Sequence, residues 1–490
     1  MNKNDILAIA LLGGICLLRL LFATTIGIVP DEAYYWDWSR IPAFGYFDHP
    51  PMVAWFIAAS SHILGNSLTA IKAAAVIPVF IASLFGYFLA KNYVTRRSSL
   101  LLYIVITNAV ILFCIGSLLI TPDIPMMVFW SAALYCVYIW LFRNAQWAWF
   151  PVGILIGLGL LSKYIFILFP ASLILFLLLS PQHRNKLRCW QLYAAGLCTL
   201  LLFLPNIVWN SHHDWIAIVF QMHHGLNAKH FPRFDYFGEY LGGQIGILSV
   251  FPAVLLVIAV VFFLQKKQRT PQTLLLNVFF LVPFLFFAWS SLQKRVEPNW
   301  PSPAYISGLI LIPLLWETYT GSHRRLLRSV TIASLAIVCA AAAAILIHIH
   351  TPFLPLPARS DPTAQLRGWS MWAQSVGALT STVDPGTTLP LYANRYQETA
   401  LLSFYLPGQP HVRCLNTGGR MNQYILQQQA LPHRSHALVF VYDIADTQPL
   451  PAKVAQMMLK YNRIGTAVLQ QNLHSNKPYS VFYGVTRQEF

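Results

Sequence analysis

The chain has 490 residues, of which 56% are hydrophobic and only 10% are charged, and its formal net charge is +16. A soluble domain carries about a quarter of charged residues, so this composition excludes an ordinary soluble protein. The positive charge does not indicate nucleic acid, because the basic clusters fall in every second loop between apolar runs, which is the positive-inside pattern of a polytopic membrane protein.

Apolar runs long enough to cross a bilayer recur from residue 6 to about residue 349. Such runs predict a helical bundle and not a β-barrel, whose strands would alternate. About 11 spans are expected, near 6–28, 68–90, 98–118, 124–142, 149–162, 164–180, 189–210, 244–265, 271–292, 299–316 and 329–349. The first run is long and no A-x-A site follows it, so it is interpreted as an uncleaved span. The basic loops place the N-terminus in the cytoplasm and residues 350–490 on the outer side.

The first outer loop holds a local excess of acids and aromatic residues. Its acids are Asp31, Glu32, Asp37 and Asp48, and His49 follows them. Pro30 is expected to start a helix whose first turn contains the first two acids, where negative charge is favourable. A second helix, Met52 to Leu64, is expected to lie along the membrane surface and to end at Gly65.

The favourable electrostatics of a helix start alone explains an acid in a first helical turn. It does not explain why Asp48 follows in the same loop, or why Asp123 lies at the outer end of another span. Ionisable groups at membrane depth are functional candidates by default. Function is therefore favoured for Asp31, while both interpretations stay open for Glu32 and Asp48. Tyr34 and Tyr35 fit either an interfacial aromatic belt or a surface that stacks on sugars.

Later outer loops add cations. Lys163 lies between two apolar runs with no acid nearby in sequence, so its partner must come from another segment. Lys294 and Arg295 precede a polar wall that comprises Glu297, Asn299 and Trp300. Fixed cations stabilise an anionic leaving group, which predicts a phosphate clamp, although a solvated loop also explains the last two cations.

The fourth outer loop, 211–243, is rich in histidine but matches no zinc signature, so no metal is expected there, while His224 is a candidate contact for an acceptor. The sequence has no Walker motif, no G-x-G-x-x-G loop after a strand and no H-E-x-x-H. The sequence therefore has no recognisable binding motif for a soluble nucleotide donor, and a donor that arrives through the membrane agrees better with this sequence.

The tail has ordinary polarity and predicts a small α/β domain. Residues 351–362, which are rich in proline, form the linker. Strands are expected at Leu389–Asn394, Ala437–Tyr442 and Tyr479–Val485, and helices at Met421–Ala430 and Ala452–Tyr461. The predicted domains are thus a transmembrane domain over 1–349, with outer-loop helices at 31–64, and a soluble α/β domain over 350–490.

The motifs of the outer loops together resemble one family. They are D-E-A-Y-Y-W and G-Y-F-D-H-P-P in the first loop, then Thr121–Asp123, Ser162–Tyr164, Leu204–Asn210 and Lys294–Pro301. This pattern is similar to that of the GT-C glycosyltransferases of the protein O-mannosyltransferase and lipid A aminoarabinose transferase superfamily. Where aminoarabinose transferases carry a lysine in the F-[DE]-K-P version of the first loop, this sequence has His49, which moves the expected phosphate contact toward the other cations.

The resemblance implies an inverting glycosyltransferase of the bacterial inner membrane with a periplasmic C-terminal domain. The implied partners are an undecaprenyl-phosphate-linked sugar donor, a glycolipid or protein acceptor and membrane lipid, with no nucleic acid. The implied catalytic residues are Asp31 and Asp123, and Glu32 beside Asp31 is a further catalytic candidate. The expected phosphate contacts are Lys163, Lys294, Arg295 and His49. The expected substrate contacts are Tyr34, Tyr35, Asp48, Glu297, Asn299, Trp300 and His224.

Two questions stay open from the sequence. No cofactor is required, but the acidic outer site leaves room for a divalent cation. A transporter or flippase of a lipid-linked or polar solute is the alternative function, because many spans and intramembrane charges are common to that class. The acids gather at one membrane edge and not at mid-bilayer, and no half-to-half repeat is visible, which favours the enzyme.

Overall fold

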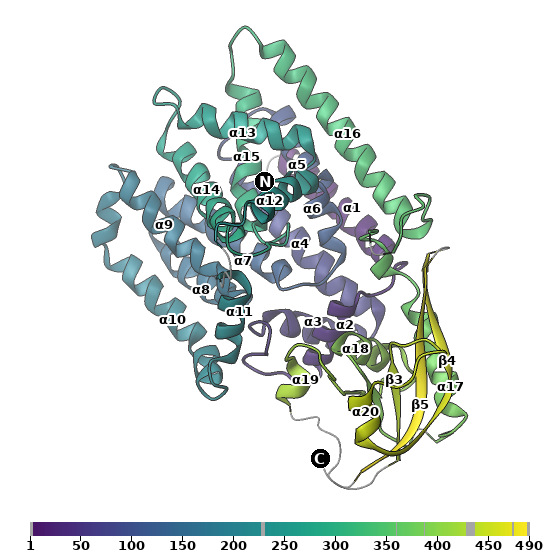
Figure 1. Cartoon of the computed structure of the whole chain (residues 1–490). Coiled ribbons are helices and arrows are strands. Elements are labelled where there is room, and N and C mark those ends of the chain that lie inside the picture. The colour runs from purple at the N-terminus through teal and green to yellow at the C-terminus, as the bar shows by residue number, and fades with distance from the viewer. Residues whose placement is uncertain are drawn as a thin grey trace. The chain divides into compact units, whose positions relative to one another are not determined.

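The computed structural model describes residues 3–226, 231–358, 360–386, 388–427, 437–472 and 475–487 (Figure 1). Contacts within the chain divide it into two compact units. The first comprises Met1–Ala23, Ala43–Ile63 and Lys72–Ala344, and the second comprises Thr24–Pro42, Leu64–Ile71 and Ile345–Phe490. The first outer loop is therefore shared between the two units, which its sequence does not indicate.

The first unit is helical. Its helices are α1 (Lys3–Ala23), α3 (Met52–Leu64), α4 (Leu68–Ala90), α5 (Arg97–Ala109), α6 (Ile111–Cys114), α7 (Asp123–Phe142), α8 (Trp149–Leu160), α9 (Leu168–Leu179), α10 (Trp190–Ser211), α11 (Ile216–Leu226), α12 (Phe234–Leu248), α13 (Val250–Leu264), α14 (Pro271–Ser291), α15 (Ser302–Thr318) and α16 (Arg324–His350). The first residues of α4 and the last residues of α16 belong to the second unit.

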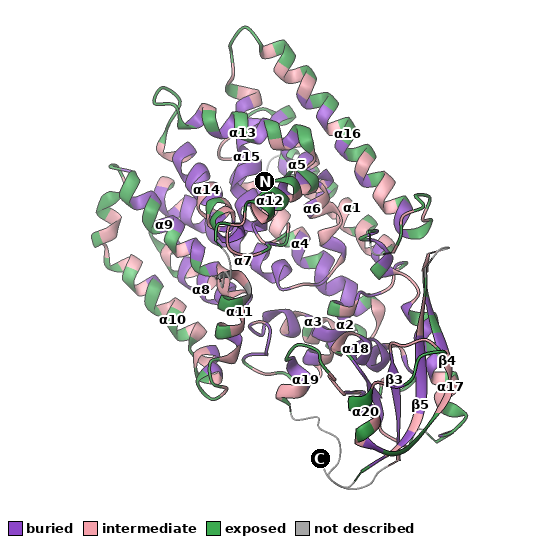
Figure 2. Ribbon diagram, viewed as in Figure 1, coloured by how far each residue is buried: buried purple, intermediate pink, exposed green. Residues whose placement is uncertain are grey.

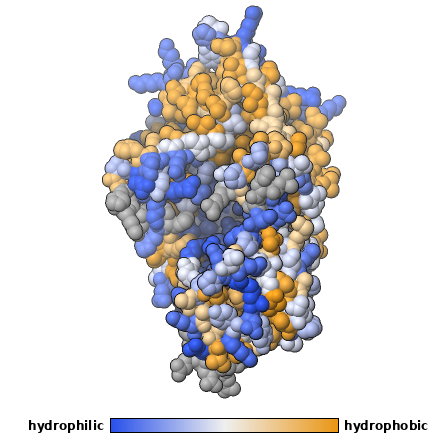
Figure 3. Space-filling model, turned by 45° about the vertical axis from the view of Figure 1, so that its right-hand side comes forward, coloured by the Kyte–Doolittle hydropathy of each residue, from blue (hydrophilic) through white to orange (hydrophobic). Residues whose placement is uncertain are grey.

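Burial separates the inner from the outer helices of this unit. Most residues of α7 and α15 are buried, whereas α1 and α10 are largely exposed although they are apolar (Figure 2). Figure 3 shows hydrophobic side chains gathered over the helical part of the molecule and mainly hydrophilic ones over the part that contains the sheet. A helix that is apolar all round and still exposed requires lipid around it, so the chain is a multi-pass membrane protein.

The number of spans differs from the prediction. Within the described ranges six helices are long and apolar enough to cross a membrane, or up to eight if each of two bent pairs counts as one span, so the count of eleven is not confirmed. The predicted spans 98–118 and 244–265 each fall on a pair of helices joined at a sharp bend. The helices Arg97–Ala109 and Ile111–Leu118 meet at 69° around Val110, and α12 and α13 meet at 104° around Ser249, where φ is +68°. Such breaks interrupt helical hydrogen bonding and are not visible in hydropathy.

The second unit is an α/β domain together with one helix of the first outer loop. Its helices are α2 (Pro30–Ser39), α17 (Trp369–Ser381), α18 (Tyr396–Tyr405), α19 (Gln423–Leu426) and α20 (Ala452–Met457), and its strands are β1 (Leu391–Ala393), β2 (Arg413–Cys414), β3 (Ala437–Tyr442), β4 (Met458–Asn472) and β5 (Ser475–Thr486). The strand order is β2-β1-β3-β5-β4; β1 is parallel to β2 and β3, and β5 is antiparallel to β3 and β4.

The three predicted strands are confirmed, but the predicted helix Ala452–Tyr461 is wrong beyond Met457. Met458 begins β4, which pairs with β5 from Met458 opposite Thr486 to Asn472 opposite Ser475. This long hairpin replaces local helical hydrogen bonds by a ladder, so tertiary pairing overrides the local pattern. Of the predicted helix Met421–Ala430, the structure shows α19, which Asn422 caps by accepting from two backbone N–H groups, and residues 428–430 lie outside the described part.

Glu398, in the first turn of α18, is buried and makes the second unit sensitive to pH. Burial raises the pKa of its carboxyl group from 4.5 to about 7. Because the unfolded chain ionises this group at lower pH than the folded chain does, the free energy of unfolding should fall as pH rises from 4.5 to 7, by up to about 3 kcal/mol. Glu398→Gln should flatten this part of the pH profile of the melting temperature, and the exposed Glu239→Gln should not.

Candidate functional site

Three side chains from distant segments meet at the N-terminus of α7. The Nζ atom of Lys163 lies 2.8 Å from Oδ1 of Asp123, and Nδ2 of Asn299 donates to the other carboxylate oxygen at 2.8 Å. The side chains of the lysine and the aspartate are only 12% and 10% exposed. The expectation that the partner of Lys163 comes from another segment is confirmed, because the partner is 40 residues away.

Local backbone structure fixes the lysine. Lys163 is extended and follows α8 directly before the 3-10 turn Tyr164–Ile167, and its backbone N–H donates to Gly159 at 3.1 Å. In the same turn the carbonyl of Leu161 accepts from the N–H of Met52 at 3.0 Å. The start of α3, and with it the end of the first outer loop, is therefore tied to the segment that carries the lysine.

The second half of the first outer loop is held by α10 and α11. Asn206 donates from Nδ2 to the carbonyl of Phe44 at 2.7 Å, and Gln221 donates from Nε2 to the carbonyl of Asp48 at 2.5 Å. Asp48 is buried, and Nδ1 of His49 lies 3.5 Å from the same amide of Gln221. The motif Leu204–Asn210 thus positions the loop, a role that sequence reasoning missed although the spacing of its polar residues on one helix face was the available signal.

Gly45 is required for this docking. A Cβ atom built at Gly45 would lie 2.4 Å from Cε3 of Trp209, whose indole stacks on the ring of His213. Gly45→Ala should displace the indole and lower the free energy of unfolding by roughly 1–3 kcal/mol. The melting temperature in detergent measures this effect. Gly14→Ala is the matched control, since a Cβ there meets nothing within 4 Å; equal melting temperatures of the two variants would contradict the docking role.

The residues of α2 belong to the second unit. Asp31 is exposed in the first turn of α2. Glu32 is buried and its Oε2 accepts from the backbone N–H of Val29 at 3.0 Å, so it serves the helix start. Tyr34 and Tyr35 are buried, and the hydroxyl of Tyr34 accepts from a backbone N–H at 2.6 Å. These contacts describe capping and packing, and the predicted roles of the four residues with substrate stay predictions, as does a single pocket shared with Asp123 and Lys163 of the first unit.

The loop after α14 carries Asn299, which contacts Asp123, but its two cations, Lys294 and Arg295, contact other residues. Lys294 donates from Nζ to the carbonyl of His223 at 2.6 Å, and Arg295 pairs with Glu239 at 3.1 Å on the surface. Trp300 packs against Phe287, with ring centroids 5.9 Å apart. Glu297 is exposed, and the side chain of His224 lies outside the described part. The structure thus brings Lys163, Asp123 and Asn299 together, and the phosphate roles of Lys294 and Arg295 stay predictions.

Two further observations concern charge in the first unit. Lys72 is fully buried and donates from Nζ to the carbonyl of Leu118 at 3.3 Å. Within the residues that the structure describes, no group of three or more His, Cys, Asp or Glu side chains is arranged to hold a metal ion.

Comparison with known proteins agrees with this architecture. Residues 48–209 match the family model described as dolichyl-phosphate-mannose-protein mannosyltransferase. The chain is 24% identical over 322 residues to the lipid A galacturonosyltransferase RgtD of Rhizobium johnstonii, covering 62% of this chain and 64% of the relative. It is also 24% identical over 302 residues to undecaprenyl phosphate-alpha-4-amino-4-deoxy-L-arabinose arabinosyl transferase 2 of Proteus mirabilis, covering 56% and 52%. The chain thus matches less than two thirds of the length of these relatives.

The fold matches a solved structure over almost the whole chain. The crystal structure of ArnT from Cupriavidus metallidurans bound to undecaprenyl phosphate superposes with a TM-score of 0.69 at 14% sequence identity, covering 98% of both chains. The apo state of the same protein gives a TM-score of 0.68 and covers 97% of both chains. The chain therefore has the fold of this solved protein, and the family match over residues 48–209 includes the segments that carry Asp123 and Lys163.

Proposed function

We propose that the chain is an integral-membrane inverting glycosyltransferase that moves a monosaccharide from a polyprenyl-phosphate donor to an acceptor on the outer side of the inner membrane. The observation that carries this proposal is the meeting of Lys163, Asp123 and Asn299, which the sequence contributes from three separate outer loops. A transporter needs no such edge site, whereas a transferase needs a fixed cation where the phosphate leaves.

The geometry suits a leaving phosphate. Asp123 holds Lys163 at 2.8 Å, and the two side chains are only 12% and 10% exposed, so the ammonium group does not reorganise when a phosphate arrives. Asn299 occupies the second oxygen of the carboxylate, which fixes its orientation. The N-terminus of α7 adds a positive helix-dipole end at the same position. In this proposal Asp31 accepts the proton of the acceptor hydroxyl, or orients a phosphate acceptor, as it attacks the anomeric carbon.

The named relatives support a glycolipid acceptor. One carries lipid A in its name, and the matched crystal structure holds undecaprenyl phosphate. A protein hydroxyl is the second acceptor class, since the family model describes protein mannosyltransferases. Purified chain incubated with radiolabelled undecaprenyl-phosphate sugars should label lipopolysaccharide. If the labelled sugar instead crossed a vesicle membrane while still bonded to its lipid phosphate, this would establish the flippase alternative.

The proposed orientation has a cytoplasmic N-terminus and a periplasmic second unit. It rests on the basic loops that alternate with the outer acidic ones. A membrane-impermeant maleimide should therefore label Lys453→Cys, an exposed position in α20, when the outer membrane of intact cells is permeabilised. Labelling only after lysis of the inner membrane would reverse the orientation.

A divalent cation at the acidic residues of the outer site stays a prediction. If Asp31 and its neighbours hold one, dialysis against EDTA should abolish transfer and Mg²⁺ or Mn²⁺ should restore it. Transfer that is unchanged in EDTA would remove the cation from the proposal and leave Lys163 as the charge that faces the phosphate.

A further inference from the structure

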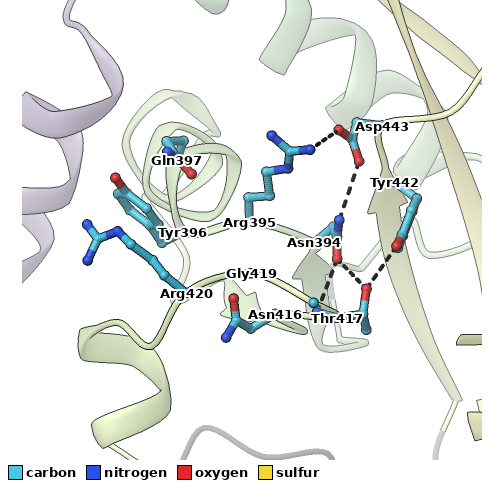
Figure 4. Close-up of a pocket in the computed structure, with 11 residues that line it drawn as sticks. Asn394, Arg395, Tyr396, Gln397, Asn416, Thr417, Gly419, Arg420, Tyr442 and Asp443 are labelled. Atoms are coloured by element: carbon cyan, nitrogen blue, oxygen red, sulfur yellow. Dashed lines mark hydrogen bonds and ion pairs between the residues drawn. The ribbon is translucent and has the colours of Figure 1, made fainter. Parts of the chain in front are cut away.

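The second unit contains a cavity of about 430 Å³ at the carboxyl ends of its parallel strands (Figure 4). Asn394 follows β1, Asn416 and Thr417 follow β2, and Asp443 follows β3. β1 lies between β2 and β3, and the chain leaves β1 through α18 to reach β2 on one side before β3 forms on the other. In an open α/β sheet this switch point is where ligands bind, and the volume is that of a small-molecule site.

A hydrogen-bonded network gives the cavity a fixed polar wall. Oδ1 of Asn394 accepts from the hydroxyl of Thr417 at 2.6 Å, and Nδ2 of Asn394 donates to Asp443 at 3.3 Å. The hydroxyls of Thr417 and Tyr442 lie 2.9 Å apart. Figure 4 shows these side chains in one cluster, in which amide, hydroxyl and carboxylate groups are linked by hydrogen bonds. Such a cluster of both donors and acceptors suits a ligand that carries several hydroxyl groups.

Arg420 and Tyr396 form the side of the cavity opposite this wall (Figure 4). The lining contains two arginines and one aspartate, so its net charge is positive. Arg395 pairs with Asp443 at 3.1 Å, and the guanidinium of Arg420 lies over the ring of Tyr396, 4.7 Å from its centroid. The cavity also receives the N-terminus of α18, whose N-cap residue Arg395 makes no side-chain capping bond. An anionic group next to an aromatic face is the complement of this side, because guanidinium binds phosphate or carboxylate in a planar fork.

We propose that this cavity binds a sugar that carries a phosphate or a carboxylate. Arg420, which lies over the ring of Tyr396, binds the charge, and the wall formed by Asn394, Thr417 and Asp443 binds the hydroxyls. The proposal rests on the proposed function for its biological source, which is the anionic saccharide of a glycolipid acceptor. The second unit then selects the acceptor at a site separate from Lys163 and Asp123.

Calorimetric titration of the full chain in detergent tests the site with defined probes: glucose 1-phosphate, glucuronic acid, glucose and inorganic phosphate. The two charged sugars should bind more tightly than glucose, and Arg420→Gln should weaken them by roughly 10- to 100-fold, the worth of one charge-assisted hydrogen bond. Tighter binding of glucose 1-phosphate than of glucuronic acid assigns the charge to a phosphate, and the reverse order assigns it to a uronic acid. Inorganic phosphate that binds as tightly as glucose 1-phosphate would overturn the saccharide assignment.

Matched variants separate the site from general effects. Arg413→Gln is the control, because Arg413 also lies over a tyrosine ring, that of Tyr392 in β1 at 5.8 Å from its centroid, but does not line the cavity. Thr417→Val should weaken the binding of glucose 1-phosphate but not that of inorganic phosphate. Equal losses of affinity for the charged sugars in Arg413→Gln and Arg420→Gln would overturn the proposal. Unchanged affinity in Arg420→Gln would also overturn it.

The binding assay tests the proposed cavity, and the transfer assay tests the proposed function, so each proposal can be refuted without the other. A chain that transfers sugar but binds none of the charged probes would refute the cavity and leave the proposed function intact. A chain that binds them but transfers nothing would refute the function alone. With lipopolysaccharide as acceptor, Arg420→Gln should raise the KM for the acceptor and leave kcat unchanged, which a merely structural role would not do.

Discussion

Asp31→Asn should lower the rate of sugar transfer by roughly 10²–10⁴-fold, the usual contribution of a general base. An amide cannot accept the proton of the acceptor hydroxyl, so the nucleophile stays neutral. The substitution keeps the shape of the side chain, and Asp31 is exposed, so no buried charge is lost. The favourable interaction of its charge with the start of α2, which is worth about 0.3–1 kcal/mol, disappears. Single-turnover transfer from radiolabelled donor measures the chemical step.

The matched control is Asp235→Asn. Asp235 also lies in the first turn of a helix, α12, and its side chain is 56% exposed. Both variants should melt within a few degrees of the wild type, but only Asp31→Asn should lose transfer. Near-normal turnover by purified Asp31→Asn protein would defeat the assignment of the base, and an equal loss in both variants would point to a general effect of charge on the outer surface.

Lys163→Met should lower kcat/KM for the lipid-linked donor by roughly 10- to 100-fold, because the leaving phosphate loses a charge-assisted contact. The same change also destabilises the fold. It leaves the carboxylate of Asp123 with Asn299 but without its cation, and breaking a buried ion pair costs about 3–5 kcal/mol, with less expected here because both side chains are about a tenth exposed.

A double variant separates the two effects. Asp123→Asn combined with Lys163→Met removes both charges, so the melting temperature should recover toward that of the wild type. Donor use should stay low, because the phosphate still lacks its cation. Lys91→Met provides the control, since Lys91 pairs with Asp5 at 2.6 Å in the same unit, and it should lose stability without a change in donor kinetics. Unchanged donor kinetics in both Lys163 variants would remove the lysine from the site.

The relative placement of Asp31 and the pair Lys163–Asp123 is a separate question. The proposal requires them to act on one substrate, although they belong to different compact units. A disulfide or a short bifunctional maleimide between Asp31→Cys and Asp123→Cys, in a background without the seven native cysteines, tests this requirement. Cross-linking in the presence of donor lipid is expected, and its absence with reagents of every length would separate the base from the phosphate site.

Several features follow from the sequence alone. The apolar runs define where the helices of the first unit lie, and the predicted span 68–90 coincides with α4. Pro30 starts α2 and Gly65, at φ +70°, follows the end of α3, because proline and glycine impose their backbone preferences locally. The alternation of basic loops predicts a polytopic membrane protein, and the motifs of the outer loops resemble those of one family. Each of these signals is contained in a short window of neighbouring residues.

Tertiary structure decided the rest. The bends at Val110 and Ser249, and the long strand β4 where a helix was predicted, depend on packing partners that hydropathy does not specify. Lys163 finds Asp123 and Asn299 only because α7, the turn after α8 and the loop after α14 converge at one end of the bundle. The cavity at the ends of β1, β2 and β3 likewise exists only once the strand order is set. Local propensity fixes elements, whereas the choice of partners between distant segments is made by the burial and hydrogen bonding of the whole fold.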